Sequence, residues 1–154
     1  GDIEPPVLER VLHIATELAR EGREGRPVGT AFIIGDSEKV MALSQQMVIN
    51  PFRGYRDEER SILDPSLEET IKEFSTIDGA FVLRGDGVVL SAGAYLRSDK
   101  PAGELASGLG SRHAAASAIT AQTDAVAITL SQSTGRVSMF KSGQLVLSLD
   151  RTKE

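Results

Sequence analysis

The sequence contains no cysteine, which excludes disulfide bonds and thiolate metal sites. This absence fits a reducing compartment, and we expect the protein to be cytoplasmic. No apolar run reaches the roughly 18 residues that a membrane span requires, and the acidic start GDIEPPVLER lacks the apolar segment of a signal peptide. No long basic run occurs and the net charge is −5. We therefore expect neither a membrane nor a nucleic acid as a partner of this chain.

The composition that remains is that of an ordinary globular protein. The chain has 154 residues, of which 40% are hydrophobic and 25% are charged. This length fits one domain and is sufficient to bury a core without covalent staples.

Three segments carry helical signals. Apolar side chains recur at helical spacing over 5–20, with a proline pair in the first turn. Segment 66–74 begins with Ser66, a favoured N-cap, and has Glu69 three residues later, which is a capping-box pattern. The third segment, 112–123, is rich in alanine. We predict a helix over each.

Strand signals fill much of the rest. A nearly continuous apolar run over 125–132 predicts a strand near the centre of a sheet. Glycine-containing turns between apolar runs predict two hairpins. The predicted single strands are 30–35 and a weaker one at 39–43, and the hairpins are 79–96 and 136–149. Together these elements predict a mixed α/β domain with a mostly antiparallel central sheet and helices packed on both faces.

The stretch GLGSRHAAASAIT has the features of an anion site. Gly110 lets the backbone approach a ligand, Ser111 can cap the following helix, and Arg112 offers a planar donor fork. His113 adds a donor or, when neutral, a metal ligand. A helix start favours phosphate, but ordinary helix capping explains the same residues. No lysine follows the glycines, which excludes a P-loop.

Three further positions are candidates from the residues alone, each with a plain structural alternative. Asp78, just before a predicted strand, could bind a divalent cation or accept a proton, although Asp-Gly pairs commonly form turns. Ser131, Gln132 and Ser133 follow the apolar strand and could donate to phosphates, or simply form a polar turn. Tyr95 could stack on a base or belong to the sheet.

Taken together, four motifs resemble the diadenylate cyclase (DAC) domain. They are DGA at 78–80, GSRHAAA at 110–116, LSQSTG at 130–135 and KSGQL at 141–145. The resemblance runs from about Val28 to Leu149, in the same order and at matching spacing. It implies an enzyme that condenses two ATP molecules into cyclic di-AMP and releases pyrophosphate.

The resemblance also implies how such a domain is organised. The catalytic domain would occupy residues 26–150, and the helical segment 1–25 would be regulatory or oligomerising. The active site would form between two face-to-face domains, so self-association would be needed for activity. The cofactor would be Mn²⁺ or Mg²⁺, arriving with ATP.

Site residues follow from the resemblance position by position. Asp78, Arg112 and His113 would be catalytic, and Asp78 and His113 would also bind the metal. The implied nucleotide-binding residues are Gly79, Ala80, Tyr95, Leu96, Gly110, Ser111, Ser131 and Ser133.

One departure keeps other functions open. The family motif often has a second arginine where this chain has Ala114. A nucleotide-binding sensor without turnover is therefore the main alternative, and an interaction domain in which glycine and alanine serve packing is another. A different nucleotidyltransferase or phosphohydrolase lacks support, because no cluster of paired carboxylates has metal-binding spacing.

Overall fold

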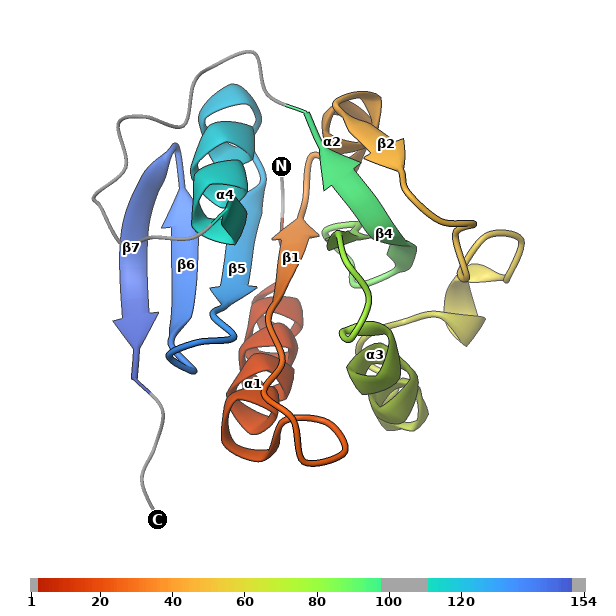
Figure 1. Ribbon diagram of the computed structural model, residues 1–154. Coiled ribbons are helices and arrows are strands. Elements are labelled where there is room, and N and C mark those ends of the chain that lie inside the picture. Colours follow the sequence, from red (N-terminus) through yellow and green to blue (C-terminus); the bar gives the residue numbers. More distant parts are fainter. Residues whose placement is uncertain (1–2, 98–110, 151–154) are drawn as a thin grey trace.

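A seven-stranded sheet forms the centre of the computed structural model, which describes residues 3–97 and 111–150. Its order is β2-β4-β3-β1-β5-β6-β7 (Figure 1). The strands are β1 (Thr30–Ile34), β2 (Ser44–Gln46), β3 (Ala80–Leu83), β4 (Val89–Leu96), β5 (Val126–Leu130), β6 (Val137–Lys141) and β7 (Gln144–Leu149). The helices are α1 (Pro5–Glu21), α2 (Ser37–Ala42), α3 (Glu68–Phe74) and α4 (Ser111–Gln122), with short 3₁₀ turns η1 (Asp57–Glu59) and η2 (Pro65–Leu67).

The sheet is antiparallel except at one seam. β1 runs parallel to β3, and the other neighbouring pairs are antiparallel. Helices pack on both faces, since α1 and α3 contribute to one apolar cluster and α2 and α4 to the other. The predicted mixed, mostly antiparallel α/β architecture is confirmed. Both predicted hairpins are present, as β3–β4 and β6–β7.

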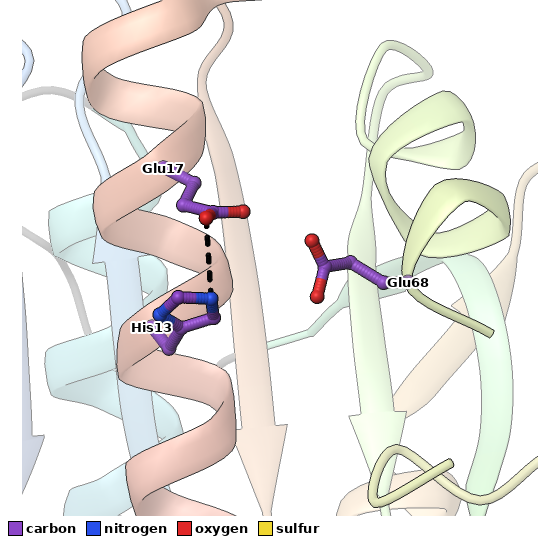
Figure 2. A group of neighbouring side chains, drawn as sticks. All are labelled: His13, Glu17 and Glu68. Carbon is purple, nitrogen blue, oxygen red and sulfur yellow. Dashed lines mark ion pairs between the residues drawn. The ribbon is translucent and has the colours of Figure 1, made fainter. Parts of the chain in front are cut away.

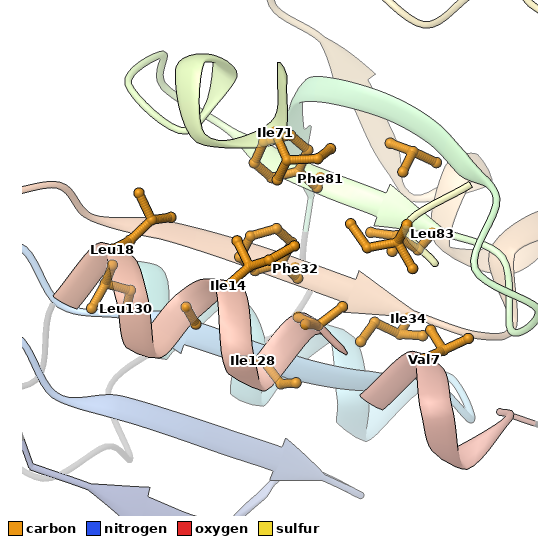
Figure 3. Close-up of a cluster of buried hydrophobic side chains, with 14 of the residues drawn as sticks. Val7, Ile14, Leu18, Phe32, Ile34, Ile71, Phe81, Leu83, Ile128 and Leu130 are labelled. Carbon is orange, nitrogen blue, oxygen red and sulfur yellow. The ribbon is translucent and has the colours of Figure 1, made fainter. Parts of the chain in front are cut away.

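The first face carries the larger core, beneath α1 (Figure 3). Val11, Ile14 and Leu18 recur at helical spacing and are almost fully buried against the sheet. Across the parallel seam, the rings of Phe32 and Phe81 stack with centroids 4.8 Å apart. α1 is thus part of the central packing, and a regulatory or oligomerising role for residues 1–25 stays a prediction.

The second face is covered by the alanine-rich helix α4. Ala116 and Ile119 pack on Ala127 of β5 and Phe140 of β6. Small side chains let a helix lie close to a sheet, because little volume separates the two backbones. This close seating fixes the position of the first turn of α4 over the end of β5.

The predicted strand at 39–43 is wrong, because the chain forms the short helix α2 there. Val40 is the one buried residue of this helix. Glu38, Lys39 and Met41 favour helix over strand, and one buried β-branched residue does not outweigh them.

The predicted capping box at Ser66 is also wrong. Asp64 caps this segment instead, and its Oδ1 accepts hydrogen bonds from the Ser66 amide at 3.0 Å and the Ser66 hydroxyl at 2.9 Å. Proline at the next position suits a first helical turn, so Asp64-Pro65 sets the start. The segment opens as η2 and becomes α3 only at Glu68.

Candidate functional site

Two adjoining cavities open at the end of the sheet where β3 begins and β5 ends. The first cavity has a volume of about 520 Å³ and the second about 560 Å³, both within the range of small-molecule sites. Asp78, Arg112 and Gln132 line both cavities. The first is completed by Ala31, Met47, Gly79, Ala80, Ala94, Tyr95, Leu96, Ser111 and Ala115.

The first cavity brings together residues that the sequence analysis selected from three separate segments. They come from the start of β3, the end of β4 and the first turn of α4, and they are Asp78, Gly79, Ala80, Tyr95, Leu96, Ser111 and Arg112. Tyr95 is 55% exposed, so its side chain is accessible to a ligand. Their roles remain predictions, but their proximity is a property of the fold.

Asp78 reaches the cavities because of an unusual approach between two backbones. Gly79 has φ = +100°, and a Cβ atom there would lie 2.7 Å from the carbonyl carbon of Gly93 in β4. Only glycine fits such a contact in that conformation. The loop therefore lies flat against β4, and the Asp78 carboxylate stays exposed at the junction of the two cavities.

Arg112 lies beside Gly29, which the sequence analysis missed, and Gln132, which it named as a candidate phosphate donor. A Cβ atom on Gly29 would lie 2.9 Å from Arg112 Nη1 and 3.0 Å from the Gln132 backbone nitrogen. Gly29 therefore leaves the space in which the guanidinium rests. Gln132, unlike the two serines beside it, lies on the wall of both cavities.

Ser131 and Ser133 line neither cavity. Their hydroxyl oxygens are 3.3 Å apart, and Ser131 Oγ also accepts a bond from the Thr134 amide at 3.4 Å. Here they close the turn between β5 and β6, and their predicted phosphate contacts stay untested. Gly110 lies outside the described residues.

His113 points away from both cavities, into the packing between α4 and β6. It is 6% exposed, its Nε2 lies 3.3 Å from Ser138 Oγ, and its ring meets Phe140 edge to face. Burial lowers the pKa of His113, and the positive charge of Arg136 lowers it further. The structure does not place His113 beside Asp78, and the predicted metal contact has no geometric support.

Within residues 3–97 and 111–150, one group of three potential metal ligands occurs: His13, Glu17 and Glu68 (Figure 2). A lysine ammonium already occupies it, because Lys72 Nζ lies 2.6 Å from Glu17 Oε1 and 3.1 Å from Glu68 Oε2. The bond from Lys72 lowers the pKa of Glu17. Burial alone would lower the pKa of Lys72, but its bonds to the two glutamates raise it overall. This group serves as an ion-pair clamp between α1 and α3.

In the part of the chain that the structure describes, no helix has the length and apolar character to cross a bilayer.

Comparison with known proteins places the chain in a family. The family model described as DisA bacterial checkpoint controller nucleotide-binding (DAC) matches residues 17–145. A protein named diadenylate cyclase from Methanocaldococcus jannaschii is 45% identical over 143 residues, which cover 93% of this chain and 45% of that protein. One of the same name from Haloferax volcanii is 42% identical over 150 residues, covering 96% of this chain and 54% of that protein. The chain thus spans about half the length of these relatives.

Solved structures support the fold. DacA from Staphylococcus aureus gives a TM-score of 0.55 at 22% identity, covering 96% of this chain and 87% of that one. A hypothetical membrane spanning protein from Bacillus cereus gives 0.65 at 22% identity, covering 90% and 61%. Because the family model spans most of the sequence and both relatives are more than 40% identical over nearly all of this chain, the chain belongs to the diadenylate cyclase (DAC) domain family.

Proposed function

We propose that this chain condenses two ATP molecules into cyclic di-AMP with release of pyrophosphate. One observation carries the proposal: the first cavity gathers Asp78, Tyr95 and Arg112, which lie far apart in the sequence. The name diadenylate cyclase carried by two relatives supports the same reaction.

The first cavity suits an adenine nucleotide. Its apolar side, with Met47, Tyr95 and Leu96, would hold the base, and the Tyr95 ring offers a stacking surface. Its polar side, with Asp78 and Arg112, would face the ribose and phosphates. A base in the apolar part directs the 3′-hydroxyl and α-phosphate toward the junction of the two cavities.

Asp78 would act as the general base. Its carboxylate accepts the proton of the 3′-hydroxyl, and that oxygen attacks the α-phosphorus of the second ATP. The bond from this phosphorus to the bridging oxygen breaks, and pyrophosphate leaves with the electron pair. A second transfer of the same kind closes the ring. Arg112 would stabilise the negative charge that develops on the phosphoryl oxygens.

A divalent cation fits the residues present. Mg²⁺ commonly binds through one or two carboxylates together with substrate phosphates, and the first cavity offers the Asp78 carboxylate at its junction with the second. Asp78 would hold the ion through one oxygen and leave the other for the proton. When bound, the ion would neutralise phosphate charge.

The reaction needs two domains, because each ATP attacks the other and the first cavity has room for one base. We propose that two copies pair face to face with their cavities opposed. The exposed Tyr95 and Asp78 at the rim agree with a site that a second copy completes.

The test is product analysis. The protein is incubated with ATP and Mg²⁺ or Mn²⁺, and cyclic di-AMP and pyrophosphate are quantified by chromatography and mass spectrometry. We expect product from the parent and at least a hundredfold less from Asp78→Asn, because general bases contribute about 10²–10⁴ in rate. Glu9→Gln, which removes an exposed carboxylate of α1 outside both cavities, is the matched control and should retain activity.

Two outcomes would contradict the cyclase. ATP binding without product at high protein concentration would indicate the sensor, an alternative that the alanine at position 114 favours. Absence of any adenine nucleotide binding would indicate an interaction domain.

A further inference from the structure

The second cavity contains arginines that the proposed reaction does not yet use. Its lining adds Arg23 and Arg26, from the turn between α1 and β1, to the Asp78, Arg112 and Gln132 that it shares with the first cavity. The remaining lining residues are Glu24, Pro27, Val28, Gly29, Glu73, Ser75 and Thr76. The two cavities therefore adjoin at the three residues that they share.

The turn that carries Arg26 is tightly built. The amides and carbonyls of Arg23 and Arg26 exchange hydrogen bonds of 2.9 and 3.0 Å. The two residues between them, Glu24 and Gly25, have φ of +52° and +76°, as in a type I′ turn. A Cβ atom on Gly22 would lie 2.2 Å from the Arg26 carbonyl oxygen. Glu24 is the non-glycine residue that has a positive φ in this turn, and this backbone conformation is strained. Such strain is common where a fold positions a functional group.

The two arginines of the turn differ in their partners. Arg23 is bonded to α3, with Nη1 2.9 Å from Glu69 Oε2 and Nη2 3.1 Å from Glu73 Oε1. These carboxylates hold the pKa of Arg23 above its usual value. Among residues 3–97 and 111–150, the side chains of Arg26 and Arg112 have no ion pair or hydrogen bond. Arg23 therefore anchors the turn, and Arg26 is left to bind a ligand.

We propose that the second cavity is a polyphosphate subsite in which Arg26 binds the β- and γ-phosphates of the ATP whose base lies in the first cavity. This rests on the proposed function. Arg112, at the junction, contacts the chain of phosphates between the two cavities, and guanidinium groups bind phosphate oxygens through paired hydrogen bonds. When the α-phosphorus bond to the bridging oxygen breaks, the pyrophosphate is already held by Arg26 and departs from the second cavity.

The test compares ligands that carry adenosine, a chain of three phosphates, or both. Calorimetry with Mg²⁺ measures the dissociation constants of ATP, AMP and inorganic tripolyphosphate for the parent, Arg26→Ala and Arg20→Ala. Arg20 is an exposed arginine of α1 outside both cavities, so its variant carries the same charge change. We expect Arg26→Ala to weaken ATP and tripolyphosphate by about tenfold, as for loss of one charged hydrogen bond, and to leave AMP unchanged. Arg26→Lys should restore part of the affinity.

Several outcomes would overturn the subsite. They are unchanged ATP affinity in Arg26→Ala, equal weakening of ATP and AMP, or equal effects in Arg20→Ala. Failure of the proposed function has a different signature. Tripolyphosphate would then bind in an Arg26-dependent way while AMP does not bind at all, or ATP would bind without forming product. Far-ultraviolet circular dichroism of each variant confirms that an exposed side chain was replaced without unfolding.

Discussion

Gly79 determines where the Asp78 carboxylate lies, and its replacement should show this. We expect Gly79→Ala to reduce the free energy of unfolding by more than about 2 kcal/mol, because a positive φ costs roughly 1–2 kcal/mol for alanine and the new Cβ would overlap Gly93. Urea unfolding measures the change.

Gly54→Ala is the control for Gly79→Ala. Gly54 also has a positive φ, of +90°, but no atom lies within 4 Å of the place that an added Cβ would take. Gly54→Ala should lose only the cost of placing alanine at positive φ, roughly 1–2 kcal/mol. Equal losses in the two variants would show that the contact with β4 is unimportant.

Buried His113 should make stability depend on pH. Because burial lowers its pKa below 6.5 in the folded protein, the unfolded chain binds a proton first as the pH falls. The contribution is complete above about pH 6.5 and is lost as the pH falls toward the folded pKa. Urea unfolding between pH 7.5 and 5 should show a steeper loss for the parent than for His113→Asn. Parallel curves would mean that His113 takes up a proton freely in the fold.

At the scale of residues, the motifs predicted most of the side chains that line the first cavity. They did not predict Gly29, which leaves room for the Arg112 side chain. Gly29 reaches Arg112 only because β1 lies beside β5 with Thr30 opposite Leu130, and no local pattern encodes that pairing. His113 was predicted at the site together with Arg112 because both belong to a motif that carries the family resemblance. Adjacent helical residues point about 100° apart, so one faces the cavity and the other the core.

Among the elements, α1 and α3 are joined by the buried Lys72. It is 6% exposed and bonded to Glu17 and Glu68. Lys72→Met should reduce the free energy of unfolding at pH 7 by roughly 1.5–3 kcal/mol, the range for hydrogen bonds to charged groups. Thermal unfolding followed by circular dichroism measures it.

The pH dependence of the same variant provides the control for Lys72→Met. The pKa of Glu17 is lowered from 4.5 in the fold, so its bond stabilises the protein above about pH 4.5 and is lost as the pH falls. The difference between parent and Lys72→Met should therefore shrink toward pH 3. A difference that stays constant would attribute the loss to packing of the methylene chain.

The elements that could be predicted are those whose structure is determined by a few neighbouring residues. The β6–β7 hairpin follows from Ser142-Gly143, both at positive φ in a two-residue turn. The hairpin of β3 and β4 follows from its own glycine-rich turn. Segment 39–43 has one buried residue, Val40. A single buried position cannot show whether apolar residues recur at helical or at strand spacing, and the strand prediction there was wrong for that reason.

For the whole molecule, the proposed pairing of two copies makes activity depend on concentration. The rate of cyclic di-AMP formation per protomer should fall as the protein is diluted through the dissociation constant of the pair. Initial rates at saturating ATP, measured beside sedimentation velocity at the same concentrations, test this. A rate per protomer that stays constant while the protein is monomeric would exclude a site shared between two copies.

The overall topology was the least predictable property. The two predicted hairpins indicated a mostly antiparallel sheet, which is confirmed, yet nothing local indicated that β1 would run parallel to β3. That seam depends on the whole connection from Gly35 to Gly79, with α2, β2 and α3 inside it. Its direction is set by which faces of these elements must be buried.

The central position of β1 has a consequence for the order of events during folding. Both neighbours of β1 lie later in the chain, and β5 ends only at Leu130. As the protein is synthesised, both edges of the apolar strand β1 stay unpaired until β3 and β5 have been made. Unpaired apolar strands favour aggregation. We expect the β1 amides that bond to β5 to become protected no earlier than those of β5 in pulse-labelled refolding, so the first strand of this sheet gains its second partner only once β5 has formed.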